Sequence, residues 1–366
     1  MARRPAPIPA PAGARMVHVP DQWPGLSRGA ASCLLPAGAA VLAATAMLPR
    51  EAGWAAVLAL VIGLGVPHGA LDGEVAKPFL KPRFGRAWFP IFAAPYLALT
   101  AAVLIVWRLA PDLTLAGFLA LSVLHFGSED AGPGRPAEAF VRGGLPIALP
   151  ALIRPDETAR IFSVVTHTAM PVLPEWWTVL AWAWLVLASA WLCLRRPPFG
   201  TLAELAGLSL AFLILPPLSA FGLYFVCLHA PRHMRALADD PSRAPAVDGM
   251  GRAVVLALPI FGLTLLIGLL LWPTYPQANS VERLLALTLQ LLAALTVPHW
   301  LLDRWVERRL RSKAEWGTGT VRATRSVATA SAARLLGKIL RHVAKLAEDR
   351  RALSSATDRS RRRENH

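Results

Sequence analysis

The sequence predicts an all-α protein, a polytopic membrane helical bundle of about eight to ten transmembrane helices. Of its 366 residues 55% are hydrophobic and only 17% are charged, and the mean hydropathy is +0.45. Uninterrupted apolar runs such as 176–194 and 253–272 can each cross a hydrocarbon core of ~30 Å, because a helix rises ~1.5 Å per residue.

Ten apolar segments follow one another along the chain. They lie at about 32–48, 53–72, 87–108, 113–129, 139–153, 176–194, 201–216, 219–235, 253–272 and 284–304. The segment 139–153 is short and contains Pro146 and Pro150, so it is the one expected to re-enter the membrane rather than cross it. Lys and Arg gather in alternate connections, which by the positive-inside rule places both termini in the cytoplasm. We therefore expect a multi-pass protein of the cell inner membrane.

The two ends of the chain differ in composition from this apolar body. Residues 1–31 are rich in Pro and Ala and lack the apolar core of a signal peptide, which predicts a disordered cytoplasmic leader before a transmembrane domain at 32–305. From Arg304 onward 17 Lys and Arg stand against 6 Asp and Glu, so this stretch holds +11 of the net charge of +15. Residues 306–366 are therefore predicted to be a basic cytoplasmic tail.

Within this tail, apolar residues recur at helical spacing between basic ones near 331–347. The pattern predicts an amphipathic helix, which either lies on an anionic lipid surface or is simply solvated. No nucleic-acid recognition motif accompanies the positive charge, so nucleic acid is not an expected partner.

Five of the nine histidines lie in four short motifs inside the apolar segments, "VPHGALD", "LHFGSED", "LHAPRH" and "VPHWLLD". Each motif places a polar side chain four residues after a histidine, on the same face of a helix. The pairs are His68 and Asp72, His125 and Glu129, His229 and His233, and His299 and Asp303. All four motifs end even-numbered segments, so we expect them on the same side of the membrane at similar depth.

The cost of burying these groups indicates that they act together. One histidine in an apolar helix is most often a hydrogen-bonded core residue, but an ionisable group at a helix centre costs ~2.5–3.5 kcal/mol. Four such motifs are tolerated when they face one another, a cavity or a metal. Imidazole suits Fe(II), Zn, Cu or Ni. Asp72, Glu129 and Asp303 could orient the rings or bind the metal directly, and the sequence leaves both possibilities open.

Small and aromatic residues surround the motifs. Gly65, Gly69 and Gly73 form a stripe that predicts close helix packing, and Pro67 predicts a bend. Four aromatic residues adjoin the histidines and could line an apolar tunnel for a long conjugated substrate, or lie at the membrane interface: Phe126, Tyr224, Phe225 and Trp300.

Taken in order, the four motifs resemble those of the Brp/Blh family of bacterial and archaeal β-carotene 15,15′-dioxygenases, over roughly 63–305. "GVPHGALD" is similar to the family's Pro-His-Gly block, "LHFGSED" to its His-Phe-Gly block, "YFVCLHAPRH" to its His-x-x-x-His block and "TVPHWLLD" to its later Pro-His block. Pro231, inside the His-x-x-x-His turn, departs from the pattern.

The resemblance implies an enzyme, a non-haem iron dioxygenase whose catalytic domain is 32–305. It would cleave the central double bond of β-carotene with O₂ into two all-trans-retinal, at Fe(II). The iron histidines carry over onto His68, His125, His229 and His233. His299, with the three carboxylates, would be an orienting group or an alternative ligand. Expected partners are β-carotene, O₂, membrane lipids and, functionally, a retinal-binding rhodopsin.

Three other interpretations remain at this point. A transporter could relay protons through the His and Asp pairs, and the repeat of Val-Pro-His with Leu-Asp hints at the internal repeats of transporters. A membrane desaturase or hydroxylase would carry several paired-histidine boxes, whereas only one His-x-x-x-His occurs here. A non-catalytic carotenoid- or retinal-handling protein is the last possibility.

Overall fold

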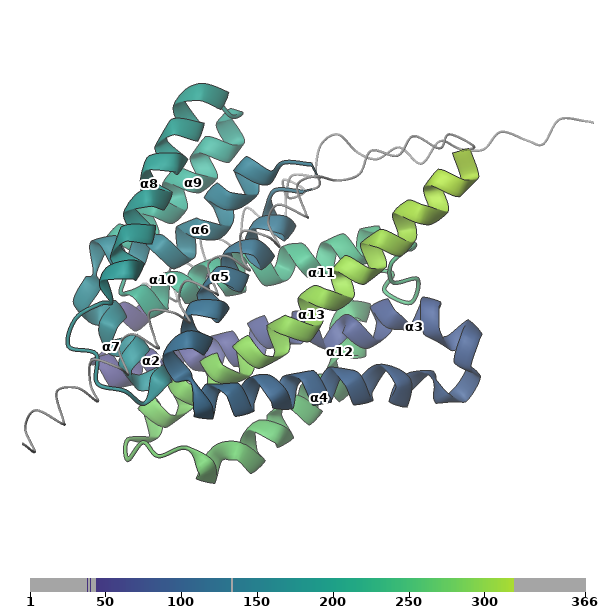
Figure 1. Cartoon of the computed structure of the whole chain (residues 1–366), viewed down its shortest axis with the longest axis horizontal. Helices are drawn as coiled ribbons and strands as arrows, with labels where there is room; N and C mark the ends of the chain where they lie inside the picture. Colours follow the sequence, from purple (N-terminus) through teal and green to yellow (C-terminus); the bar gives the residue numbers. More distant parts are fainter. Residues whose placement is uncertain (1–37, 39, 41–43, 133, 319–366) are drawn as a thin grey trace, which may run out of the picture.

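The computed structural model describes residues 38, 40, 44–132 and 134–318, and no strand occurs among them (Figure 1). The predicted all-α class is therefore confirmed. In chain order the elements are α2 (Arg50–Leu60), the π segment η1 (Val61–Gly65), the 3₁₀ segment η2 (Val66–Leu71), α3 (Asp72–Phe84), η3 (Gly85–Ala87), α4 (Trp88–Leu109), α5 (Pro111–Asp130), α6 (Pro136–Ile153), α7 (Pro155–Thr166), α8 (Glu175–Arg195), α9 (Phe199–Ile214), α10 (Pro217–Tyr224), the π segment η4 (Phe225–His229), α11 (Ala230–Asp239), α12 (Met250–Leu271), η5 (Trp272–Thr274) and α13 (Ser280–Thr318).

The helix α13 organises the bundle. It runs diagonally across the molecule with α4 alongside it (Figure 1), and it also contacts α2, α3, α5, α7 and η2. The pair α5 and α6 packs closely because small residues face each other. A side chain at Gly127 would overlap the backbone of Ala139, and one at Gly143 would overlap that of Val123.

Four stretches are long and apolar enough to cross a membrane: Arg50–Leu109, Glu175–Arg195, Met250–Thr274 and Ser280–Ser312. Large apolar side chains on them face outward, such as Leu269 on α12, which is 70% exposed. This is the surface of a membrane protein, since lipid rather than water can cover it. The total of eight to ten spans, the inner membrane and the orientation of the termini stay predictions.

The apolar segments from 53–72 onward correspond to helices, and two further helices, α3 and α7, lie where the sequence predicts connections. The helix α3 carries charged residues and two internal prolines, Pro78 and Pro82. It therefore contains no apolar run from which a helix would be predicted. The helix α7 is amphipathic, with Pro155 in its first turn and Asp156 and Glu157 behind it, a typical helix start.

The predicted leader at 1–31 and the amphipathic helix near 331–347 lie outside the described residues. The helix α13 continues to Thr318, past the boundary predicted at 305, and the division into domains stays a prediction.

The helix that carries the first motif changes type twice. The α-helical turns of α2 give way to the π segment η1 and then to the 3₁₀ segment η2 around Pro67, where the sequence predicted a bend. Of the three glycines, only Gly65 makes a close approach, to the ring of Phe225. Among the described residues nothing lies within 4 Å of a side chain built at Gly69, and at Gly73 the nearest atom is 3.8 Å away. The prediction that these glycines allow close helix packing is therefore wrong at Gly69.

Candidate metal centre

Five imidazole rings from five elements meet inside the bundle. They belong to His68 on η2, His125 on α5, His229 at the end of η4, His233 on α11 and His299 on α13. Neighbouring ring centroids lie 5.1–5.7 Å apart, and all five side chains are buried. The structure thus brings together every histidine of the four motifs.

The π segment η4 accommodates Pro231, the residue that departs from the family pattern. The N–H of Ala230 donates to the carbonyl of Phe225, an i to i−5 bond. Pro231 then lies in the first turn of α11, where an α-helix needs no N–H donor. π turns often occur at functional sites, and this one leaves His229 and His233 on either side of the change in helix type.

Two of the rings have a fixed orientation because their Nδ1 atoms have hydrogen-bond partners. Nδ1 of His68 lies 2.6 Å from the carbonyl oxygen of Gly65, which can only accept a hydrogen bond. Nδ1 of His299 lies 2.7 Å from Oδ1 of Asp72. A proton on Nδ1 leaves the lone pair on Nε2, which is the arrangement that second-sphere partners impose on metal-binding histidines.

The carboxylates contact histidines of other motifs as well as their own. Asp72 bonds His299, not His68, and its second oxygen accepts a hydrogen bond from the hydroxyl of Tyr96 at 2.8 Å. The expectation that Asp72 follows His68 on one helical face is wrong because η2 is a 3₁₀ helix with about three residues per turn. Asp303 accepts a hydrogen bond from Arg243 at 2.8 Å.

Glu129 lies among four of the rings. Its Oε1 is 3.4 Å from Nδ1 of His125 and 3.5 Å from Nε2 of His299. Its Oε2 is 3.1 Å from Nδ1 of His233 and 3.5 Å from Nε2 of His229. One carboxylate therefore faces donor atoms from four elements.

These residues fit a divalent transition metal. Within the described part of the chain, several buried nitrogen and oxygen atoms that could bind a metal have no hydrogen-bond partner: Nδ1 of His125, Oε1 of Glu129, both ring nitrogens of His229, Nε2 of His233 and Nε2 of His299. A buried polar atom left unsatisfied costs about 1–3 kcal/mol. Imidazole nitrogen and carboxylate oxygen are ligands of iron, zinc, copper and nickel, so bound metal could satisfy several of these atoms.

The donors form two groups, within each of which the ligand atoms lie within 4.8 Å of one another. The first group is His68, His125 and His229, and the second is Glu129, His233, His299 and Asp303. Three of the four histidines expected to bind iron fall in the first group, and His233 falls in the second with the carboxylates.

Sequence reasoning missed the residues behind His229. Oδ1 of Asp130 lies 3.8 Å from its Nδ1, and Oδ2 of Asp130 accepts a hydrogen bond from the hydroxyl of Tyr224 at 2.7 Å. Arg232 lies 3.7 Å from Asp130 and pairs with Glu204 at 2.6 Å. The sequence does show Asp130, the acid next to Glu129 in "LHFGSED". It lies five residues after His125, so the four-residue spacing does not include it.

Three of the four aromatic candidates contact the rings. Phe126 lies 4.7 Å from His229 between centroids, Tyr224 stacks on the same ring, and Phe225 packs edge-on against His68 at 5.3 Å. Trp300 instead lies under the guanidinium of Arg304.

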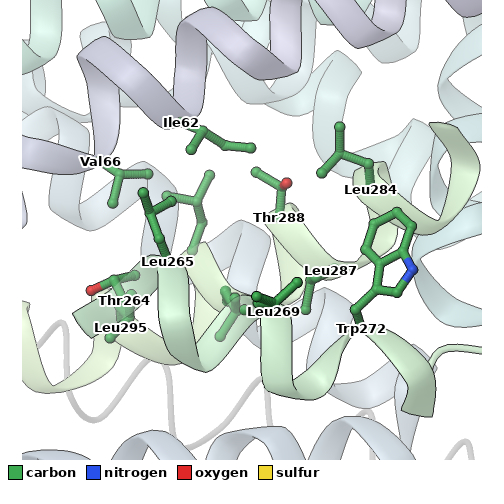
Figure 2. A pocket seen from close by; sticks show the side chains of 13 residues that line it. Ile62, Val66, Thr264, Leu265, Leu269, Trp272, Leu284, Leu287, Thr288 and Leu295 are labelled. Atoms are coloured by element: carbon green, nitrogen blue, oxygen red, sulfur yellow. The ribbon is translucent and has the colours of Figure 1, made fainter. Parts of the chain in front are cut away.

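An apolar cavity of about 240 Å³ lies between η1, η2, α12 and α13 (Figure 2). Ile62 and Val66 face Leu265 and Leu269 across it, and Thr288 adds a hydroxyl. None of the four aromatic candidates lines this cavity. Val66 lies two residues before His68, so the cavity adjoins the segment that carries the first ligand candidate.

Comparison with known protein families matches residues 59–307 to the family described as beta-carotene 15,15'-dioxygenase. The chain belongs to this family. The match spans all five clustered histidines and confirms the resemblance seen in the four motifs.

Two curated relatives in the β-carotene dioxygenase family are similar over most of their length. The beta-carotene 15,15'-dioxygenase of uncultured marine bacterium 66A03 is 29% identical over 265 residues, which cover 70% of this chain and 94% of the relative. The probable beta-carotene 15,15'-dioxygenase Blh of Halobacterium salinarum is 28% identical over 300 residues, covering 71% and 86%. No solved structure matches the chain.

Proposed function

We propose that this membrane protein uses O₂ to cleave the central 15,15′ double bond of β-carotene, giving two all-trans-retinal at a non-haem Fe(II) centre. The observation that carries the proposal is the convergence of five buried imidazoles, four of which have a ring nitrogen without a hydrogen-bond partner among the described residues, inside the region that matches the family. The names of the two relatives support the substrate and the bond cleaved.

The histidines proposed to bind iron at this centre are His68, His125, His229 and His233. His299, 5.2 Å from His233 between ring centroids, can replace or supplement them. Bound Fe(II) would supply the one-electron chemistry that allows O₂ to react with a hydrocarbon polyene. Neutral imidazole ligands leave its charge at +2.

The protein's own part is orientation and exclusion of water. The carbonyl of Gly65 and the carboxylate of Asp72 hold the protons of two rings on Nδ1. Phe126 and Phe225 are buried against the histidines, which keeps water away and makes the surroundings compatible with a hydrocarbon. Such a site aligns one double bond beside the metal rather than supplying an acid or a base.

The apolar cavity gives the substrate a way in from the membrane. Leu265 and Leu269 on its rim are 45% and 70% exposed, on a stretch that is apolar enough to face lipid. A carotenoid dissolved in the bilayer could therefore enter between α12 and α13 without passing through water. This route is part of the proposal.

The test is expression in cells that accumulate β-carotene, with retinal measured by chromatography. We expect retinal with the wild-type chain and none with His68→Ala or His233→Ala. His167→Asn is the matched control, since His167 lies at the end of α7 outside the cluster. Folded wild-type protein that contains iron but forms no retinal would contradict the proposal. Protein without stoichiometric metal would favour the proton-relay alternative.

A further inference from the structure

The donor set around Glu129 is larger than one metal ion can use. Five imidazoles and the carboxylates of Glu129 and Asp303 make up the two groups of ligand atoms. A non-haem iron site that reacts with O₂ keeps open positions and commonly uses three protein ligands. Seven donors leave several without a role if only one ion binds.

The second group has a positioning system of its own. His299 is held by Asp72, and Asp72 in turn by the hydroxyl of Tyr96. This chain from imidazole to carboxylate to hydroxyl is the kind that orients metal ligands. It directs Nε2 of His299 toward Glu129, at 3.5 Å, and toward Asp303, at 3.9 Å.

Asp303 is also fixed for a bound cation. Arg243 donates to its Oδ1 at 2.8 Å, while Oδ2 is the oxygen that faces His299. The other donor of this group, Nε2 of His233, is buried and has no hydrogen-bond partner in the described part of the chain. The second group thus combines positioned ligands with unsatisfied ones.

Glu129 has the geometry of a bridge. Each of its oxygens faces both groups. Oε1 lies 3.4 Å from Nδ1 of His125 in the first group and 3.5 Å from Nε2 of His299 in the second. Oε2 lies 3.5 Å from Nε2 of His229 in the first and 3.1 Å from Nδ1 of His233 in the second. Ligand atoms about 2.0–2.2 Å from a shared metal lie about 3.3–3.6 Å from each other in tetrahedral geometry, so the spacings of 3.5 Å to His229 and His299 suit a metal between the two atoms. The carboxylate therefore lies between the two groups, where it can contact an ion in each.

We propose that the centre binds two metal ions bridged by Glu129, one held by His68, His125 and His229 and the other by His233, His299 and Asp303. Two-metal sites place their ions about 3.5–4 Å apart, a separation that one carboxylate can bridge. The two "VPH" motifs then contribute one histidine each, His68 to the first ion and His299 to the second. The inference rests on the proposed function only for the identity of the metal as iron.

The test is metal stoichiometry, measured on full-length protein purified without a histidine tag and loaded anaerobically with Fe(II). Elemental analysis should give two irons per chain, and Mössbauer spectra should show two coupled ions. Asp303→Asn keeps the size of the side chain and an oxygen that can accept from Arg243, so it should fold and bind one iron. His125→Ala should also bind one, and His167→Asn should keep two.

The outcome distinguishes this inference from the proposed function. Saturation of the wild type at one iron per chain, with no change in Asp303→Asn, would overturn the two-metal site even if retinal forms. Two irons without retinal would leave the site in place and contradict the function. If His125→Ala does not fold, the wild-type stoichiometry and Asp303→Asn decide the question.

Discussion

Gly65 offers the sharpest test of how the histidines are positioned. A methyl group at this residue would lie 2.6 Å from Cδ1 of Phe225 and closer still to Cε1. To restore a contact of 3.4 Å the ring must move by about 1 Å, and such overpacking costs about 1–3 kcal/mol. Phe225 is buried and packs on both His68 and His229, so its displacement moves two ligand candidates.

We therefore expect Gly65→Ala to reduce the free energy of unfolding by about 1–3 kcal/mol and retinal formation by about 10²-fold, the usual effect of a 1 Å misplacement in an active site. Thermal unfolding in lipid nanodiscs and a timed retinal assay measure the two effects. The smaller side chain in Gly65→Ala/Phe225→Leu should restore part of both.

Gly69 provides the matched control. It lies four residues away on η2, and no described atom lies within 4 Å of a side chain built there. Gly69→Ala should change stability by less than about 1 kcal/mol, because a compatible Gly→Ala change acts mainly on the unfolded chain. Equal losses in Gly65→Ala and Gly69→Ala, or no rescue by Phe225→Leu, would refute the reasoning.

Three further changes test other parts of the structure. Asp72→Asn removes the carboxylate behind one imidazole and should weaken iron retention against a chelator about 10- to 100-fold; unchanged retention would show that Asp72 does not orient a ligand. Gln290→Leu leaves the carbonyl of Val165 without its donor at 2.7 Å and should cost about 1–3 kcal/mol of stability by thermal unfolding, whereas an unchanged midpoint would contradict that contact. Burial lowers the pKa of His167 below its ordinary value, and the nearby Arg108 guanidinium lowers it further. Below about pH 6.5 the unfolded chain therefore takes up a proton on this histidine that the folded chain does not. The thermal unfolding midpoint should therefore decrease as the pH is lowered from about 7 to about 5. It should decrease less in His167→Asn. The same decrease with pH in both proteins would disprove the role of this histidine.

The sequence predicted the helical class and the four motifs because both depend on local spacing. Apolar runs show buried or lipid-facing helices, and a histidine four residues from an acid stands out in such a run. The helix α3 carries charges and prolines and contains no apolar run, so the sequence pattern does not predict it. It packs on α4 and on the histidine segment η2.

Pairings between elements could not be read from spacing within one element. Asp72 is hydrogen-bonded to His299, which lies 227 residues away in the chain. Asp303 accepts a hydrogen bond from Arg243. Both depend on how α3, α13 and the turn after α11 are brought together. The change of η2 to a 3₁₀ helix also altered which side chains share a face, and no spacing rule based on an α-helix predicts it.

Cleavage of the central bond at an iron centre built from these histidines is the central claim, and product stoichiometry tests it most directly. Purified protein stripped with a chelator and reloaded anaerobically with Fe(II) should convert each β-carotene into two molecules of retinal, and the stripped protein should form none. Two unequal cleavage products, one shorter and one longer than retinal, or equal activity before and after reloading, would contradict the claim.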